Sequence, residues 1–248
     1  MRAVIVGASS GLGRSIGIGL GQRGASVALL ARRHDRLVDA AKEAGPGSLA
    51  IACDATNATS CQAAIEEAAR GLGGIDALLY APGVGPLGLL VDTDAETWRQ
   101  TFETNVIGAA LVTAAAIPHL TESRGVAAYL TSVNGSLTDP WPGLGVYATT
   151  KAALETMVEA WRAEHPAVGF TRVIVGDCAG GEGHSMTEFA NNWDMGLLSE
   201  FHPMWAERNL LSGALMEVDE LIRVVDLVLR CGASASIPSV AVTPRRPA

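Results

Sequence analysis

Hydrophobic and polar positions divide this chain of 248 residues into short apolar runs and longer mixed stretches. The apolar runs have few polar interruptions, which is typical of parallel strands covered on both faces. We expect strands at residues 3–6, 27–31, 49–53, 77–81, 126–131, 169–175 and 237–242. Between them, Ala/Leu/Glu-rich stretches predict helices near residues 12–22, 35–44, 58–71, 95–120, 147–164 and 217–231. This alternation predicts a doubly wound α/β sheet with helices on both faces, and no linker divides it, so we expect one domain over 1–248.

One stretch interrupts the alternation after the sixth expected strand. Residues 176–213 begin with several glycines and continue with large apolar side chains. This connection is longer than the roughly two to six residues usual between a strand and a helix. Its length and position predict a lid over a ligand at about 180–213; an extra pair of helices packed through aromatic side chains is the other interpretation. The candidates for substrate contact within it are Trp193, Phe201 and Trp205.

Charge and composition narrow the class of protein. The net charge of −8 argues against a nucleic-acid-binding surface, which needs a basic stripe. No uninterrupted apolar run approaches the ~20 residues of a membrane span, so we expect no membrane association. A strand that begins at residue 3 leaves no room for a secretory signal, and the four cysteines show no metal-binding spacing. We therefore expect a cytoplasmic protein with reduced thiols. Two prolines in the tail, 243–248, leave its part in any oligomer interface open.

A glycine-rich segment, Gly7-Ala-Ser-Ser-Gly11-Leu-Gly13, lies between the first expected strand and the first helix. Glycines permit positive φ and let the backbone approach a pyrophosphate, while the helix start offers N–H groups to the phosphates. The spacing is G-x3-G-x-G rather than G-x-G-x-x-G, but its position predicts a dinucleotide-binding loop. The expected cofactor contacts in this loop are Gly7, Ser9, Ser10, Gly11, Leu12 and Gly13.

The end of the second expected strand selects between the two nicotinamide cofactors. An acidic residue there would bind the adenosine ribose and repel a 2′-phosphate. This chain has Arg32 and Arg33 instead, and guanidinium groups suit a phosphate. We therefore expect NADP(H), with NAD(H) as the alternative. Asp54, just after the third strand, is either an acceptor for the adenine amino group or a turn residue.

Tyr147 and Lys151 lie four residues apart in an expected helix, so their side chains share one face. The chain has only two lysines, Lys42 and Lys151, and otherwise uses arginine. An ammonium beside a phenol favours the phenolate, so we expect the pKa of Tyr147 to lie below its ordinary ~10. A phenol of lowered pKa suits a general acid/base near neutral pH. Taken alone, such a pair is also common on a solvated helix face.

These features follow the order seen in short-chain dehydrogenases/reductases, which the chain resembles from residue 1 to about 175. The matching residues are Gly7, Gly11, Gly13, Asp54, Asn105 in Thr104-Asn-Val-Ile-Gly108, Ser132 in Leu130-Thr-Ser-Val-Asn-Gly135, Tyr147 and Lys151. The resemblance implies a seven-stranded Rossmann fold and a nicotinamide cofactor. It also implies hydride transfer at a carbonyl or alcohol carbon, and a homodimer or homotetramer.

The resemblance further implies a role for each catalytic candidate. Tyr147 would exchange a proton with the substrate oxygen. Lys151 would hold the nicotinamide ribose hydroxyls and depress the pKa of Tyr147. Ser132 would hydrogen-bond the substrate oxygen as charge develops there. Asn105 is similar to the family residue that anchors a water on the proton path to Lys151.

The chain departs from the family pattern after two strands. Tyr80-Ala-Pro-Gly83 stands where Asn-Asn-Ala-Gly is usual, so we expect different bracing there, with Ala81 and Gly83 against the cofactor. Gly176-Asp177-Cys178 stands where Pro-Gly is usual. Gly176 is expected to contact the cofactor, and Asp177 lies either near the nicotinamide carboxamide or in a turn.

The interval between the candidate serine and tyrosine is a third departure. It is 15 residues, longer than usual in the family, and Asn134 and Ser136 lie nearer the common spacing. We assign Ser132 because Leu-Thr-Ser-Val-Asn-Gly matches the end of the fifth strand. Trp141, shortly before Tyr147, either lines the substrate pocket or packs.

We therefore expect an NADP(H)-dependent oxidoreductase that transfers hydride between the nicotinamide and a ketone, aldehyde or secondary alcohol. The aromatic and Met-rich lid favours an apolar substrate. His184, Glu188, Asp194 and His202 match no standard ligand spacing, so no metal is expected. The alternatives are a non-catalytic nicotinamide-binding sensor or scaffold, and an NAD-dependent alcohol dehydrogenase of the same fold.

Overall fold

A computed structural model describes residues 1–245; the last three residues of the proline-containing tail, 246–248, lie outside the described part. Seven parallel strands form one sheet, in the order β3-β2-β1-β4-β5-β6-β7. Their bounds are β1 Arg2–Val6, β2 Ser26–Ala31, β3 Leu49–Ala52, β4 Ala77–Tyr80, β5 Val126–Ser132, β6 Gly169–Val175 and β7 Ser239–Val242. The predicted seven-stranded doubly wound sheet is confirmed, and the last strand begins two residues later than predicted.

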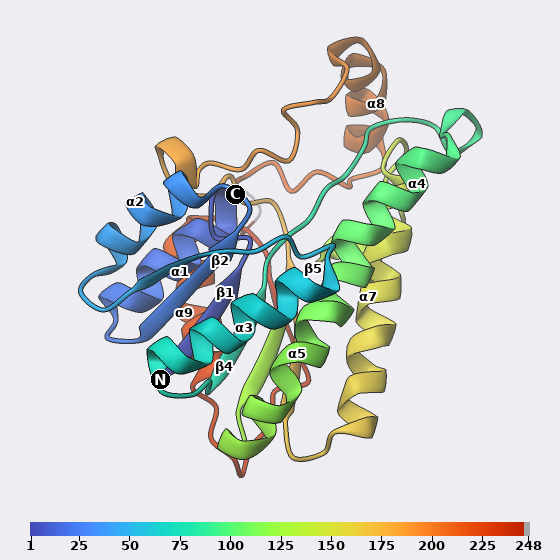
Figure 1. The fold of residues 1–248 in the computed structure, drawn as a ribbon. Helices are drawn as coiled ribbons and strands as arrows, with labels where there is room; N and C mark the ends of the chain where they lie inside the picture. The colour runs from blue at the N-terminus through green and yellow to red at the C-terminus, as the bar shows by residue number, and fades with distance from the viewer. Residues whose placement is uncertain (246–248) are drawn as a thin grey trace.

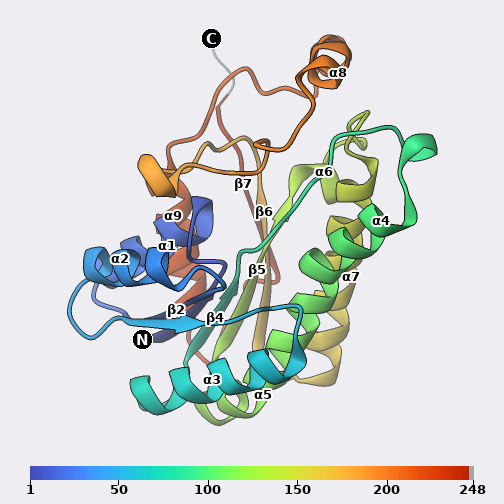
Figure 2. The same cartoon turned by 45° about the horizontal axis from the view of Figure 1, so that its top comes forward.

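Helices cover both faces of the sheet, as predicted (Figures 1 and 2). On one face lie α1 Gly11–Gln22, α2 His34–Ala44 and α9 Val218–Leu229. On the other lie α3 Ala58–Leu72, α5 Gly108–Ser123 and α7 Gly145–Glu164. Strands β1 to β6 therefore send side chains into two separate apolar cores, which explains why their sequences are apolar at nearly every position, while the edge strand β7 packs only against the first core.

The single helix predicted over 95–120 is wrong in detail. The chain forms α4 Ala95–Phe102, a π-helical turn Glu103–Ile107, and then α5. Within the described residues, the combined stretch Ala95–Ser123 has the length and hydropathy of a membrane span. Its α5 side chains Ala109, Val112 and Leu120 are nevertheless buried in the core beneath the sheet. Burial in that core therefore explains why α5 is apolar.

The loops that follow β1, β4, β5 and β6 meet at the carboxyl edge of the sheet. The chain order reverses between β1 and β4, which is the crevice where ligands bind in open α/β sheets. The loop after β4 brings the Pro82 ring against Gly7, where an added Cβ would lie 3.0 Å from it. The sheet therefore places the predicted glycine loop next to the ends of β4 and β5.

The stretch predicted as a lid lies beyond this carboxyl edge (Figures 1 and 2). It contains a 3-10 turn, Gly183–Ser185, and one α-helix, α8 Met195–Glu207, which stands away from the sheet. Both ends of the stretch are tied together at Asp177. Its carboxylate accepts hydrogen bonds from the backbone N–H and the hydroxyl of Ser212, and its carbonyl accepts from Met216 N at 2.9 Å. Asp177 therefore holds the two ends of this segment together. These contacts agree with the second of its two predicted positions, in a turn.

Candidate active site

Tyr147 and Lys151 project from the first two turns of α7 toward the carboxyl end of β5. The Lys151 side chain is buried, and its Nζ donates to the Leu130 carbonyl oxygen at 2.8 Å. The same nitrogen lies 5.7 Å from the centroid of the Tyr147 ring. An added Cβ on Gly83 would lie 3.3 Å from it, so the glycine after β4 leaves room for the ammonium. The two side chains share one face, as the spacing predicts, and on that face Lys151 is buried while Tyr147 is half-buried.

The expectation that Lys151 lowers the pKa of Tyr147 is wrong for this structure. Burial raises the pKa of Tyr147 to about 12, while the hydrogen bond with Ser132 acts to lower it. Burial also lowers the pKa of Lys151 to about 8, and the nearby Glu155 carboxylate opposes that shift. The reason is geometric, because the ammonium is bonded to a backbone carbonyl and both groups are desolvated. The phenol is therefore held in its protonated form at neutral pH.

Ser132 is the last residue of β5 and the N-cap of a short helix, α6 Val133–Ser136, that the sequence did not predict. Its oxygen accepts from Asn134 N at 3.3 Å, and its hydroxyl is the group that lowers the pKa of Tyr147. The two residues at the commoner spacing are used elsewhere. Asn134 Oδ1 accepts from Trp141 N at 3.0 Å, and Ser136 Oγ donates to Glu155 at 3.0 Å. Ser132 is thus the one placed beside the phenol.

Asn105 lies in the π-helical turn between α4 and α5 and is fully buried. Its Oδ1 accepts from Val84 N at 2.9 Å, and its Nδ2 donates to Val84 O and to Thr150 Oγ1, both at 2.8 Å. The side chain therefore connects the loop after β4 to the residue that precedes Lys151. A π-turn places a side chain out of register with the flanking helices, which is how this amide reaches both partners.

The predicted change in bracing after β4 is present. Tyr80 is fully buried, and its hydroxyl donates to the Thr104 carbonyl oxygen at 2.5 Å. An added Cβ on Gly108 would lie 2.6 Å from that hydroxyl oxygen, so Gly108 makes the space that the tyrosine occupies. A phenol here holds the start of the π-helical turn, and through it the position of Asn105.

The glycine loop closes tightly around its own backbone. Gly7 has φ of 83°, and an added Cβ on Gly13 would lie 2.4 Å from the Gly7 carbonyl oxygen. Ser10 is the N-cap of α1 and makes no side-chain cap within the described residues. The loop therefore leads directly into the first turn of α1, which begins at Gly11 without a side-chain cap from Ser10 within residues 1–245. A helix N-terminus that follows a glycine loop fits a bound phosphate.

Arg33 and Arg36 converge on one carboxylate beside this loop. Arg33 donates to Ser9 Oγ and, at 2.7 Å, to Ser10 Oγ. Glu188 from the lid stretch accepts from Arg33 Nη1 at 2.9 Å and from Arg36 Nη1 at 2.7 Å. Arg32 is exposed, and the pKa of Asp54 is lowered mainly by its hydrogen bonds with Thr56, with a smaller effect of the Arg32 charge. The sequence therefore missed Arg36; its spacing of three residues from Arg33 at the start of a helix was the available signal.

The remaining cofactor candidates line the same edge. Asp54 accepts from Thr56 N and Thr56 Oγ1 through Oδ1 only, so it holds the turn after β3. Ala81 lies against Gly13, and Ala81 N donates to Val6 O at 3.1 Å. Gly176 N donates to Val242 O at 2.9 Å, which places it at the end of β6.

A continuous row of aromatic rings runs from the phenol into the lid stretch. The Phe189 ring lies edge-on to Tyr147, with centroids 4.8 Å apart, and Trp193 follows it at 5.4 Å. Trp193 Nε1 donates to Gly85 O at 2.7 Å. The sequence missed Phe189, whose separation from Tyr147 along the chain left no local signal.

The other substrate candidates belong to the same cluster. Trp141, Phe201 and Trp205 are buried together, and Trp205 Nε1 donates to Pro142 O at 2.8 Å. The ring centroids of Trp141 and Trp205 are 5.4 Å apart. These three side chains pack the lid stretch onto the loop before α7, which matches the packing interpretation of Trp141.

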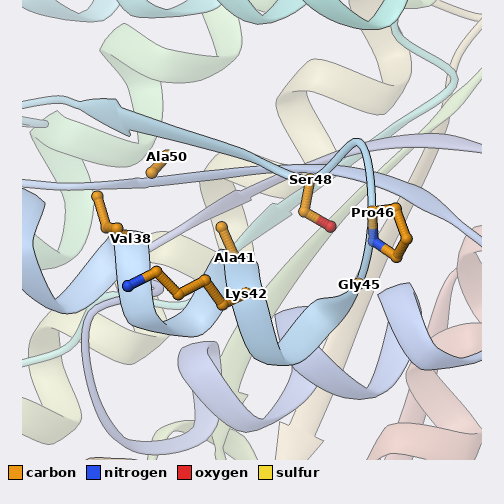
Figure 3. A pocket seen from close by; sticks show the side chains of 7 residues that line it. All are labelled: Val38, Ala41, Lys42, Gly45, Pro46, Ser48 and Ala50. Atoms are coloured by element: carbon orange, nitrogen blue, oxygen red, sulfur yellow. The ribbon is translucent and has the colours of Figure 1, made fainter.

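Two further features lie away from this site. Within residues 1–245, no group of three or more His, Cys, Asp or Glu side chains could hold a metal. Asp194, one of the four side chains considered for a metal, instead caps α8 through Leu197 N at 3.0 Å. A surface hollow of about 560 Å³ lies between α2 and the edge strand β3 (Figure 3), and among the described residues Lys42 is the only ionisable one that lines it. It contacts none of the residues of the predicted site.

Comparisons with known proteins match most of the chain. The model of the family described as short chain dehydrogenase matches residues 1–192. Among curated relatives, 11-beta-hydroxysteroid dehydrogenase-like 3 of Arabidopsis thaliana is 35% identical over 179 residues, which cover 70% of this chain and 57% of the relative. An uncharacterized oxidoreductase of Staphylococcus saprophyticus is 34% identical over 168 residues, which cover 67% of this chain and 68% of the relative. The chain spans little more than half the length of the first of these relatives.

Solved structures share the fold at low sequence identity. An alcohol dehydrogenase from Thermococcus sibiricus, complexed with 5-hydroxy-NADP, has a TM-score of 0.79 at 22% identity, covering 97% of this chain and 94% of that one. A 3-ketoacyl-(acyl-carrier-protein) reductase from Brucella melitensis, complexed with NADH, has a TM-score of 0.80 at 24% identity, covering 97% and 96%. The carboxyl edge described above is thus set in a well-known architecture.

Proposed function

The chain belongs to the short chain dehydrogenase family, and we propose that it is an NADP(H)-dependent oxidoreductase acting on a ketone, aldehyde or secondary alcohol. The proposal is supported most strongly by the arrangement of three side chains. Tyr147, Ser132 and the buried ammonium of Lys151 meet at the carboxyl edge of the sheet, beside the crevice of the glycine loop. A proton donor and a hydrogen-bond donor for an oxygen therefore lie next to a site that fits a dinucleotide.

The residues of the crevice fit a phosphorylated nicotinamide cofactor. Arg33, Arg36 and Ser10 already bind an anionic group, the carboxylate of Glu188, which marks a site for a second anion such as a 2′-phosphate. The glycine loop and the start of α1 would hold the pyrophosphate, Asp54 the adenine amino group, and Lys151 the ribose hydroxyls. The remaining expected contacts, made by backbone or small side chains, are Ala81, Gly83 and Gly176. When bound, the nicotinamide supplies or accepts the hydride.

The protein's own part in the reaction is movement of one proton. In reduction, Ser132 donates a hydrogen bond to the carbonyl oxygen, and Tyr147 gives that oxygen its proton. In oxidation, both steps reverse. A pKa of about 12 keeps Tyr147 protonated at neutral pH, which is the form that reduction requires. Asn105 acts as a positioning residue in this scheme, because it connects the loop after β4 to α7 beside Lys151.

The substrate we propose is apolar and bulky. The ring next to Tyr147 is Phe189, and the apolar cluster of Trp141, Trp193, Phe201 and Trp205 continues from it. Several relatives are named hydroxysteroid dehydrogenases, a name that denotes a large apolar alcohol. Turnover of a panel that runs from small polar to bulky apolar carbonyls measures this preference, and turnover confined to small polar carbonyls would contradict it.

Turnover of the same carbonyl panel with NADPH and with NADH distinguishes the proposed function from two others. An NAD-dependent alcohol dehydrogenase is favoured by the NADH bound in one of the similar structures. A cofactor-binding sensor without catalysis is favoured by the contact of Phe189 with Tyr147, which covers the phenol. We expect NADPH oxidation in the presence of carbonyls, with a lower KM for NADPH than for NADH. Cofactor binding without turnover of any carbonyl would support the sensor, and a lower KM for NADH would overturn the cofactor preference.

We propose a cytoplasmic location and assembly as a homodimer or homotetramer, with a small carbonyl or alcohol as the partner rather than nucleic acid or membrane. The net charge of −8 supports the absence of a nucleic-acid partner. Light scattering on the purified chain measures the assembly state, and a monomer at micromolar concentration would contradict the oligomer.

A further inference from the structure

Glu188 makes the most extensive ion pairing in the lid stretch. Its two carboxylate oxygens are divided between two guanidinium groups, with Oε2 at 2.9 Å from Arg33 Nη1 and Oε1 at 2.7 Å from Arg36 Nη1. These arginines are the N-cap residue of α2 and a residue of its first turn, more than 150 positions earlier in the chain. The lid is therefore fastened to the adenosine side of the crevice by a carboxylate.

The position that Glu188 occupies is a built anion site. Arg36 contributes most to lowering the pKa of Glu188 to about 2, followed by Arg33 and the Ser10 hydroxyl. Arg33 is in turn held by the hydroxyls of Ser9 and Ser10, which belong to the glycine loop. The three side chains are one-quarter to two-fifths exposed, so a solute can reach the site. A phosphate carries a charge of roughly −1.5 to −2 at neutral pH and accepts the same guanidinium hydrogen bonds.

We propose that Glu188 determines cofactor preference by competing with the 2′-phosphate of NADP(H) for Arg33 and Arg36. The inference rests on the proposed function, since it concerns the cofactor of that same site. NADP(H) must displace the carboxylate to bind both arginines. NAD(H) has a neutral 2′-hydroxyl there, which can donate to Glu188 and leave the ion pairs intact. Glu188 thus reduces the difference in affinity between NADP(H) and NAD(H) that the two arginines would otherwise produce.

The displacement also reaches the catalytic side of the crevice. Phe189, the next residue, packs edge-on against Tyr147, and its Cζ lies 2.2 Å from where a Cβ on Gly85 would be. A shift of the backbone at Glu188 would carry Phe189 away from the phenol, because the two residues are adjacent, whereas rotation of the Glu188 side chain alone would not. In this scheme a cofactor that bears a 2′-phosphate uncovers the space beside Tyr147 through such a backbone shift, whereas one without it does not.

Two half-ligands test the competition without any need for catalysis. Adenosine 2′,5′-bisphosphate carries the 2′-phosphate, and AMP lacks it. For Glu188→Gln we expect the Kd of the bisphosphate to fall by about three- to tenfold while that of AMP changes by less than about twofold, the range of partly exposed ion pairs. Titration calorimetry at fixed ionic strength measures both constants.

Two further variants separate contact from overall charge. Glu188→Asp keeps the charge but cannot reach both arginines, so we expect the bisphosphate Kd to fall by about two- to threefold. Glu200→Gln is the matched control, because Glu200 is an exposed lid carboxylate that makes no ion pair within residues 1–245. An equal gain in Glu200→Gln, or no gain in Glu188→Gln and Glu188→Asp, overturns the proposal.

Tryptophan emission tests the link to Tyr147, since the Trp193 ring lies 5.4 Å from Phe189. The bisphosphate should change the emission of the wild type but not of Trp193→Phe, and AMP should change neither. An unchanged wild-type emission at saturating bisphosphate overturns the link. Failure of the proposed function is seen separately, as absence of carbonyl turnover with both nicotinamide cofactors, whatever the half-ligands do.

Discussion

The glycine-loop edge and the lid stretch lie against each other at the carboxyl end of the sheet, but they are held in place by different contacts. The edge is fixed by buried contacts to backbone carbonyls, with Gly13 against the Gly7 carbonyl and the buried Lys151 Nζ bonded to the Leu130 carbonyl. The lid at 180–213 is fixed by side chains, chiefly the Glu188 ion pairs and the aromatic cluster around Trp205. Tight buried contacts of this kind allow little rearrangement, whereas the partly exposed ion pairs of Glu188 can be exchanged for contacts to a ligand. The edge is therefore suited to alignment of reacting atoms, and the lid to selection of what enters.

Ser132→Ala should produce the largest loss at the edge. It removes the donor to the substrate oxygen, and it removes the hydroxyl that lowers the pKa of Tyr147. We expect kcat to fall by about 10²- to 10³-fold, the usual effect of deleting one such donor. Ser136→Ala is the matched control, because Ser136 bonds to Glu155 rather than to the phenol. Steady-state kinetics on both variants measure the difference, and similar losses would remove Ser132 from the chemistry.

Gly13→Ala tests whether backbone packing fixes the edge. The new Cβ would lie 2.4 Å from the Gly7 carbonyl oxygen, which a flexible side chain cannot relieve. We expect the free energy of unfolding to fall by about 3 kcal/mol, at the upper end of overpacking effects, together with weaker cofactor binding. Gly232→Ala has nothing within 4 Å and serves as the control. Urea unfolding measures both variants, and a Gly13→Ala protein as stable as the control would show that the loop adapts.

Lys151→Met should increase stability while it removes activity. Burial lowers the pKa of Lys151 from its ordinary 10.5 to about 8 in a side chain that is 3% exposed. Holding the ammonium therefore costs about 3 kcal/mol below pH 8, where folded and unfolded chains are both protonated. Losing the bond to Leu130 offsets about 1 kcal/mol, so we expect a net gain of about 2 kcal/mol at pH 7.

The pH dependence of that gain distinguishes burial of charge from better packing. Between pH 8 and 10.5 the unfolded lysine keeps a proton that the folded one has lost, so wild-type stability rises with pH. The advantage of Lys151→Met should therefore shrink toward pH 10. Denaturant unfolding at both pH values measures it, and an advantage independent of pH would contradict a charged, buried Lys151.

Trp193→Phe should produce the smallest change and should confine it to the lid. It removes the hydrogen bond from Nε1 to Gly85 O but keeps an aromatic ring beside Phe189. We expect about 1 kcal/mol of lost stability and a higher KM for bulky carbonyls, with kcat largely kept. Kinetics across the carbonyl panel measure this split; a fall in kcat like that of Ser132→Ala would remove the distinction between the two regions.

Features that depend on nearby residues were predictable from the sequence. The glycine loop is recognisable because a strand, three glycines and a helix follow one another directly, and Tyr147 and Lys151 share a face because α7 is regular. Bracing by Tyr80 could be anticipated only as a difference, since its partner at Thr104 and the space at Gly108 depend on a π-helical turn. No periodic pattern of apolar residues predicts a π-helical turn.

Features that depend on distant contacts or on burial were not predictable. Glu188 meets Arg33 and Arg36, and Phe189 meets Tyr147, only because the lid returns across the crevice. The same limit explains the error in the pKa of Tyr147. Spacing places an ammonium near the phenol, but it does not state how deeply both are buried or that Leu130 takes the ammonium's hydrogen bond.

The most direct test of the whole site uses NADPH labelled with deuterium at the reactive nicotinamide carbon and measures transfer of the label to the product. Product alcohol from the wild type should carry the label on the former carbonyl carbon. Tyr147→Phe should bind the labelled cofactor but form labelled alcohol about 10²- to 10⁴-fold more slowly, the range for loss of a general acid. Equal rates of label transfer in the two proteins, or no transfer by the wild type to any carbonyl of the panel, would contradict Tyr147 as the proton donor of an NADP(H)-dependent reductase.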